Sequence, residues 1–290
     1  MFKFSGPLSC RHIQISVSCF LLLGICALTN PAMAQLGLCG AGSACSCTGD
    51  PLTDVSACSP SNPDYFLCRA LEFQSKMPTK WHMNDILIMG DSITDFSRIE
   101  PEFTPIVPNS FNVAVMGSKT DDVGNFLSLF DNVISAEFPP RVPSKIVVRV
   151  GTNDLIAHLM YNAYDHCLHY YTLLEKLQAF KTKHGNNMKI YICAIPPGDP
   201  TPPAGAPTTF VADYKILVPS ANALLKTTCQ IFGFTFIDDY SKYLTSDGQL
   251  NTALFAINRL PGTNDRLHFG CAGQRLYQNT LMSELGLQSN

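Results

Sequence analysis

The sequence predicts an α/β fold in which helices cover both faces of a five-stranded, mostly parallel sheet. From about Asn84 onward, short apolar runs alternate with longer helical patterns, which is typical of strands that alternate with helices. Two of the apolar runs end in polar turns, Gly90-Asp91-Ser92 and Gly151-Thr152-Asn153-Asp154. Open α/β sheets bind ligands at the carboxyl ends of their strands, so these turns are candidate site segments.

The first predicted strand covers Ile86–Met89, a continuous apolar run of the kind found in parallel strands that are buried on both faces. It cannot continue through Gly90-Asp91-Ser92, so a serine hydroxyl is left at the carboxyl edge of the sheet. Four further apolar runs are predicted to complete the sheet, at residues 111–115, 146–150, 188–195 and 235–237.

Four longer segments are predicted to be helices. The stretch Asp121–Glu137 places its apolar side chains on one side at helical spacing. The segment 210–232 contains Pro219, and because proline lacks the N–H of a helical bond we expect an interruption there. The remaining two predicted helices cover residues 164–183 and 272–285.

A proline-rich stretch, residues 196–207, follows the fourth predicted strand. Its prolines exclude both a helix and an interior strand. It leaves the sheet at the same edge as Ser92 and Asn153, which makes it a candidate wall of a substrate pocket. The alternative is a surface loop without a role in the site.

The N-terminus has the order of a secretory signal peptide. A basic start is followed by an apolar run over residues 15–28 and then by Ala32-Met33-Ala34, a typical cleavage site. The run is short for a membrane span. Residues 1–34 are therefore predicted to be removed after Ala34, and the mature chain of 256 residues (290 less 34) is expected to be secreted or periplasmic.

Charge and hydropathy limit the partners. Loss of Lys3 and Arg11 with the signal changes the formal net charge from −3 to −5, and no basic cluster remains. Nucleic acid and anionic membrane surfaces are therefore poor partners. No other stretch is apolar enough to cross a bilayer, so we expect no stable membrane insertion.

Cysteines crowd the start of the mature chain. Nine of the twelve cysteines lie beyond the signal, and five of them fall within residues 35–78: Cys39, Cys45, Cys47, Cys58 and Cys68. In an exported chain this pattern predicts a disulfide-clipped extension, and we expect at least three disulfides in all. A zinc site is the alternative, although the segment holds no histidine.

Because the extension holds five cysteines, at least one of them has no partner within it. We expect it to pair with Cys167, Cys229 or Cys271, or to stay free. Cys193 lies inside the fourth apolar run and is predicted to be a buried thiol.

Four blocks, taken in order, resemble the SGNH (GDSL) hydrolase family over about residues 86–270. The blocks are Gly90-Asp91-Ser92-Ile93-Thr94, Asn112-Val113-Ala114-Val115-Met116-Gly117, Gly151-Thr152-Asn153-Asp154 and Asp265-Arg266-Leu267-His268. The resemblance implies a three-layer α/β/α sandwich of flavodoxin-like type over residues 79–290. It also implies a serine enzyme that cleaves ester or acyl bonds, and neither a metal nor another cofactor is expected.

The resemblance also implies a role for each matching residue. Ser92 would be the nucleophile, and because a serine hydroxyl is a weak nucleophile it needs a base, which would be His268. Asp265 would orient the imidazole and stabilise its charged form. The backbone N–H groups of Ser92 and Gly117 and the side-chain amide of Asn153 would form the oxyanion hole.

The second block departs from the family pattern at Ala114, where glycine is common. Gly117 is kept at the position whose backbone would face the oxyanion, so the hole is expected to survive. Asp91 and Asp154 are expected to brace their turns.

The function predicted on this basis is that of an exported serine esterase acting on short acyl esters, acetylated saccharides or lipid esters. One alternative is an O-acyltransferase that passes the acyl group to a sugar hydroxyl at the same site. Another is an exported binding protein with a vestigial triad.

Overall fold

The structure is a computed structural model that describes residues 68–69, 85–95, 106–135, 142–161, 166–185, 187–256 and 266–287. The predicted signal peptide, 1–34, and nearly all of the predicted cysteine-rich extension, 35–78, lie outside the described residues. Of that extension only Cys68 and Arg69 are described, and Cys68 is disulfide-bonded.

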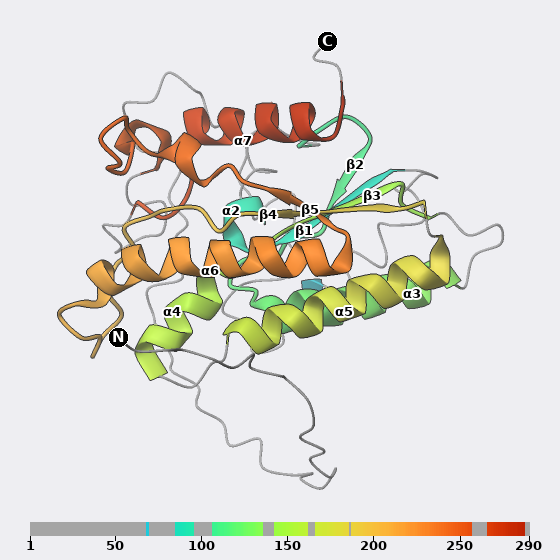
Figure 1. The fold of residues 1–290 in the computed structure, drawn as a ribbon, viewed down its shortest axis with the longest axis horizontal. Helices are drawn as coiled ribbons and strands as arrows, with labels where there is room; N and C mark the ends of the chain where they lie inside the picture. The colour runs from blue at the N-terminus through green and yellow to red at the C-terminus, as the bar shows by residue number, and fades with distance from the viewer. Residues whose placement is uncertain are drawn as a thin grey trace, which may run out of the picture. The chain divides into compact units, whose positions relative to one another are not determined.

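Five parallel strands form the sheet in the order β2-β1-β3-β4-β5 (Figure 1). This confirms the predicted five-stranded parallel sheet. The chain runs from β1 to its neighbour β2 and then crosses to β3 on the other side of β1, so the strand order reverses between β1 and β3. Such a reversal opens a crevice at the carboxyl ends of the two strands, where α/β sheets bind their ligands. The strands are β1 (Ile86–Gly90), β2 (Ser110–Asn112), β3 (Lys145–Arg149), β4 (Lys189–Cys193) and β5 (Thr235–Ile237).

The second strand is shorter than the predicted run 111–115. It ends at Asn112, whose side-chain oxygen accepts the backbone N–H of Ala114 at 3.0 Å, a local bond that bends the chain. The N–H groups of Val113 and Val115 still reach carbonyls of β1, those of Ile88 and Gly90. The predicted apolar run therefore continues beside β1 after regular strand geometry ends.

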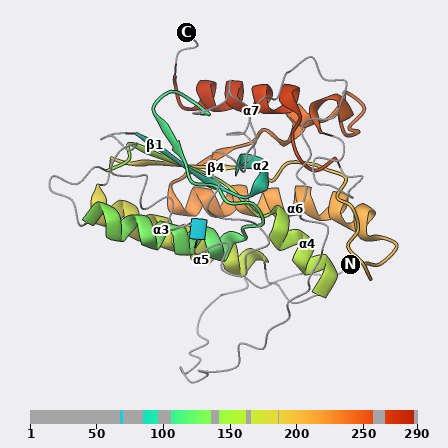
Figure 2. The same cartoon turned by 180° about the vertical axis from the view of Figure 1, so that it is seen from behind.

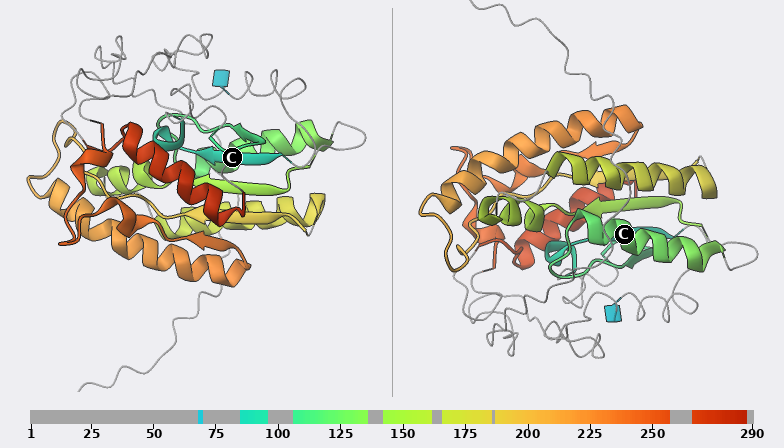
Figure 3. Two further views of the ribbon diagram at one scale, coloured as in Figure 1. Left: turned by 90° about the horizontal axis from the view of Figure 1, so that it is seen from above. Right: turned by 90° about the horizontal axis from the view of Figure 1, so that it is seen from below.

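Helices cover both faces of the sheet, as predicted (Figure 2). One face packs against four helices, and among them α5 lies between α3 and α6 (Figure 3). The opposite face packs against α7 and the two 3₁₀ helices η4 and η5. The bounds are α3 (Thr120–Ser135), α4 (Thr152–Tyr161), α5 (His166–His184), α6 (Phe210–Phe232), η4 (Tyr240–Tyr243), η5 (Thr252–Leu254) and α7 (Cys271–Glu284).

Alternation along the first strand explains why each face has a separate core. Leu87 and Met89 belong to the cluster under α3, α5 and α6, whereas Ile86 and Ile88 belong to the cluster under α7. Successive residues of a strand point to opposite faces, so a wholly apolar strand contributes to both cores.

Two predictions about helices were wrong. Helix α6 runs without interruption from Phe210 to Phe232 with Pro219 inside it. Pro219 is exposed, while Tyr214, Val218 and Leu225 of the same helix are buried. Packing of this buried side therefore outweighs the cost of one lost helical hydrogen bond, about 3 kcal/mol.

The second wrong prediction concerns the turn after β3, which opens directly into the unpredicted helix α4.

Within the described residues, no helix combines the length and the hydropathy that a membrane span requires.

Three buried cysteines of the described segments are outside disulfides. They are Cys193, which is buried as predicted, Cys229 and Cys271. Of the three partners offered for the odd cysteine, Cys229 and Cys271 are therefore not used. The number of disulfides in the whole chain stays a prediction.

Candidate active site

Ser92 stands directly beyond the carboxyl end of β1. The backbone carbonyl of Asp91 accepts the N–H groups of Thr94 at 3.1 Å and of Asp95 at 2.8 Å, and this starts the short helix α2 (Ser92–Asp95). A Cβ atom at Gly90 would lie 2.3 Å from the carbonyl oxygen of Arg149, so only glycine lets β1 pass this close to β3. The turn thus leaves Ser92 at the crevice between β1 and β3.

The structure brings His268 to Ser92 across 176 positions of sequence. The Oγ atom of Ser92 lies 2.9 Å from Nε2 of His268, which is hydrogen-bond distance. Both side chains are buried, Ser92 at 7% exposure and His268 at 3%. With the ring proton on Nδ1, Nε2 can accept the hydroxyl proton, as a nucleophile and base pair requires.

Asn153, a predicted oxyanion residue, contacts the residue that follows Gly117. Asn153 is the second residue of α4, and its amide nitrogen donates to the backbone carbonyl of Ser118 at 3.0 Å. This bond uses one of the two amide N–H groups and orients the other. The residue before Ser118 is Gly117, which has a φ of 80°, a left-handed conformation that favours glycine. The third sequence block therefore contacts the residue that directly follows the second block.

One predicted site residue cannot be placed. Asp265, the expected partner of the imidazole, lies outside the described residues, which resume at Arg266. Among the side chains that the structure does describe, no group of three or more His, Cys, Asp or Glu residues could hold a metal ion.

Three buried carboxylates lie near the carboxyl edge of the sheet, and each accepts a backbone N–H. Asp91 accepts from Ile93 at 3.1 Å, Asp95 from Met116 at 2.7 Å, and Asp154 from Thr120 at 3.1 Å. Asp91 therefore braces its own turn, as expected. Asp154 holds Thr120 at the start of α3, and Asp95 was not singled out from the sequence.

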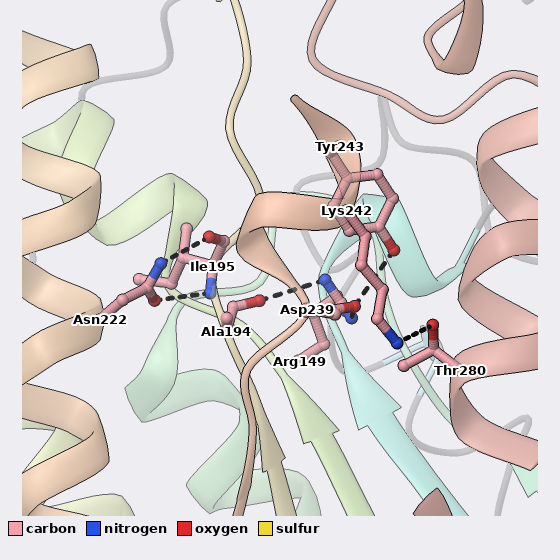
Figure 4. A network of polar contacts seen from close by, with 8 residues as sticks. All are labelled: Arg149, Ala194, Ile195, Asn222, Asp239, Lys242, Tyr243 and Thr280. Carbon is pink, nitrogen blue, oxygen red and sulfur yellow. Dashed lines mark hydrogen bonds and ion pairs between the residues drawn. The ribbon is translucent and has the colours of Figure 1, made fainter. Parts of the chain in front are cut away.

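Arg149 is the centre of a buried group of polar contacts, and it was not singled out from the sequence. Its guanidinium is buried at the end of β3, where it pairs with the carboxylate of Asp239 and donates to the carbonyl of Ala194 at 3.1 Å (Figure 4). It also lies over the ring of Tyr277, 4.2 Å from the centroid. The available signal was an arginine at the end of an otherwise apolar strand, because a buried charge requires a partner.

Solved structures of other proteins have the same arrangement of elements. A predicted acylhydrolase from Bacteroides fragilis is similar with a TM-score of 0.57 at 19% identity, over 74% of this chain and 95% of the other. A GDSL-like lipase from Bacteroides thetaiotaomicron gives a TM-score of 0.53 at 16% identity, over 75% and 97%. This chain has the GDSL hydrolase fold.

A catalytic mutant of an acetylxylan esterase from Geobacillus stearothermophilus is similar at the same level, with a TM-score of 0.50 at 14% identity over 72% of this chain and 99% of the other. No family model and no curated protein matches the sequence. At these identities the likeness establishes the fold.

Within the GDSL fold, the aspartate beside Ser92 has a raised pKa. Burial raises the pKa of Asp91 from 3.8 to about 7, opposed in part by the N–H of Ile93 and the charge of Arg149, and reinforced by the nearby Asp154. An unfolded chain loses this proton near its ordinary pKa, whereas the folded chain keeps it up to about pH 7. Asp91 therefore makes the free energy of unfolding decrease as the pH rises from about 4 to about 7.

We expect the variant Asp91→Asn to flatten the pH dependence of stability. The amide stays neutral at every pH and can still accept the N–H of Ile93, while Asp154 remains in both proteins as a common background. Urea unfolding between pH 4.5 and 8 should show the variant gaining stability relative to the parent as the pH rises. Parallel profiles for the two proteins would mean that Asp91 is ionised in the fold.

Proposed function

We propose that this chain is an exported serine ester hydrolase of the SGNH (GDSL) family. The observation that carries the proposal is the 2.9 Å contact between Ser92 Oγ and His268 Nε2 at the crevice between β1 and β3. A serine and a histidine so far apart in sequence have no packing reason to meet at a ligand-binding edge. Nucleophilic catalysis requires this pairing.

The chemistry follows from the pair. Oγ of Ser92 attacks the ester carbonyl while Nε2 of His268 takes the hydroxyl proton, giving a tetrahedral intermediate and an imidazolium. The intermediate collapses with cleavage of the bond to the alcohol oxygen, which receives the proton from Nε2. Water then attacks the acyl-serine by the same two steps and releases the carboxylic acid and free Ser92.

The proposed oxyanion hole consists of the backbone N–H groups of Ser92 and Gly117 and the amide of Asn153. Two facts support it: the amide is held by Ser118, and Gly117 adopts a left-handed conformation beside it. Asp265 is proposed to orient the Nδ1 side of His268, and this rests on the sequence block alone.

We propose short acyl esters as substrates, carried on a sugar or another small alcohol. The exposed end of the proline-rich loop and the two residues that follow it offer small side chains: Ala204, Ala206, Thr208 and Thr209. These residues favour a shallow site over a deep apolar slot for a long acyl chain. A lipid-ester substrate is the competing choice, since one structure of this fold is a GDSL-like lipase.

A panel of p-nitrophenyl esters from acetate to palmitate, run beside acetylated sugars, tests the substrate class. The expected result is that kcat/KM is highest for the acetate ester and falls with acyl length. A maximum at palmitate would contradict the proposed substrate class while leaving the serine mechanism in place. Product analysis with a labelled acyl donor and a sugar acceptor would reveal an acyltransferase.

A further inference from the structure

The proline-rich loop is not uniform, and the difference divides it into two halves. Residues 196–200 are buried except for Asp199, which is half-buried, whereas residues 201–209 are exposed apart from Ala206. A loop that served only as a pocket wall would have no reason to bury four of its first five residues. We define the buried half as Pro196–Pro200.

Helix α6 holds this buried half at both of its ends. Asn222 makes two hydrogen bonds with the backbone of Ile195, the residue before it, at 2.8 and 2.9 Å (Figure 4). Lys215 forms an ion pair with the carboxylate of Asp199 at 2.6 Å. The buried half is therefore anchored to a long helix that packs on the sheet.

The buried half in turn contacts the segment that carries His268. Asp199 and Arg266 form an isolated antiparallel bridge, with N–H to carbonyl distances of 3.3 and 3.1 Å. Gly198 lies so close to this segment that a Cβ atom there would be 2.8 Å from Cδ1 of Leu267. The buried half and the His268 segment are thus joined by backbone hydrogen bonds, and at Gly198 they lie too close together for a side chain.

A second bridge holds the segment that carries His268, on the C-terminal side of this residue. Phe255 and Phe269 form another isolated antiparallel bridge, and the N–H of Ala256 donates to the carbonyl of His268 at 2.8 Å. The imidazole is therefore carried on a short extended segment with one bridge two residues before it and one bridge directly after it. Removing the first bridge would leave only the second of these two bridges beside His268.

We propose that Pro196–Pro200 is a positioning element for the base, and that the bridge between Asp199 and Arg266 sets the distance between His268 and Ser92. This rests on the proposed function, in which His268 accepts the proton of Ser92. The exposed half of the loop is separate from this role and is free to select substrates. The structure thus divides the loop into a scaffold and a candidate specificity segment.

The test compares Asp199→Pro with Asp199→Ala. Both variants lose the carboxylate that pairs with Lys215, but only proline loses the N–H that bonds to Arg266. Because a misplacement of about 1 Å can lower a rate about 100-fold, the proline variant should have a kcat on p-nitrophenyl acetate about 10- to 100-fold below the alanine variant. KM should stay nearly equal, since binding of the ester does not use the imidazole.

A second readout reports on the pair alone. The rate at which a fluorophosphonate modifies Ser92 depends on deprotonation by His268, so this rate should fall in parallel with kcat. A merely structural role would change the melting temperature of both variants without separating them in kcat or in the rate of modification. Equal kcat values for the folded proline and alanine variants would overturn the proposal.

Gly198→Ala provides the test if the proline variant does not fold. Its Cβ atom would press on Leu267 and displace the segment, so kcat should fall by about 3- to 10-fold. When Leu267 is already alanine, the added Cβ atom has room. Gly198→Ala should therefore lower kcat less in the Leu267→Ala background than in the parent. An unchanged kcat in Gly198→Ala would contradict the proposal.

Ser92→Ala is measured beside these variants. If it retains activity, the proposed function fails. If it is inactive while the loop variants match the parent, only the positioning role fails.

Discussion

Replacement of Ser92 by alanine is expected to abolish ester hydrolysis and leave the fold intact. The hydroxyl contacts His268 at 2.9 Å, whereas the turn itself is formed by Asp91 and Gly90, so loss of the hydroxyl removes the proposed nucleophile without disturbing the turn. In serine enzymes of this kind the loss amounts to about 10⁴- to 10⁶-fold in kcat. Hydrolysis of p-nitrophenyl acetate by a preparation free of parent enzyme measures it.

His268→Ala should cost as much as Ser92→Ala, and the double variant should be no worse than either. Nucleophile and base act as one unit, so their losses do not add. Asp265→Asn is expected to be milder than either single variant. Substantial activity in Ser92→Ala, with thermal unfolding like that of the parent, would exclude the serine mechanism.

Asn153→Ala is the second large effect that we expect, with kcat lowered by roughly 100- to 1000-fold and KM nearly unchanged. The amide would meet the carbonyl oxygen only as negative charge develops there, so the loss falls on the transition state. The variant also frees the carbonyl of Ser118, which accepts one of the amide N–H groups. Steady-state kinetics on the acetate ester give the two constants.

Asn153→Asp is the matched control for size. The carboxylate keeps the shape of the amide but has no N–H to donate and adds a negative charge, so kcat should fall at least as far as in Asn153→Ala. If KM rose in both variants while kcat was preserved, Asn153 would be a substrate-binding residue outside the oxyanion hole.

Much of the fold was predictable because its elements have strong periodic patterns. Strand β5 and helix α6 have the predicted bounds, 235–237 and 210–232, and the parallel sheet follows from apolar runs that alternate with helical ones. The failures are local. Pro219 predicted an interruption of helix α6, but tertiary packing keeps the helix continuous. The residues after β3 were interpreted as a polar turn, although α4 begins there.

Short sequence blocks predict Ser92, His268, Gly117 and Asn153 as site residues. The structure shows two contacts among these segments: Ser92 with His268, and Asn153 with the carbonyl of Ser118, which follows Gly117. The sequence does not show which residue pairs with a buried charge, or which segments are joined by backbone hydrogen bonds between loops. Arg149 meets Asp239 across 90 positions.

The bridge between Asp199 and Arg266 is a contact of the same kind. No local pattern encodes such pairs, because they depend on how distant segments pack and not on what their own residues favour.

Covalent labelling tests the central claim most directly. A fluorophosphonate should attach to one residue of the active protein, with loss of fluoride and of esterase activity in equal proportion, and peptide mapping should place the adduct on Ser92. The same reagent should leave Ser92→Ala unmodified and should react far more slowly with His268→Ala. Full esterase activity after stoichiometric labelling of Ser92, or an inactivating adduct on another residue, would contradict the account.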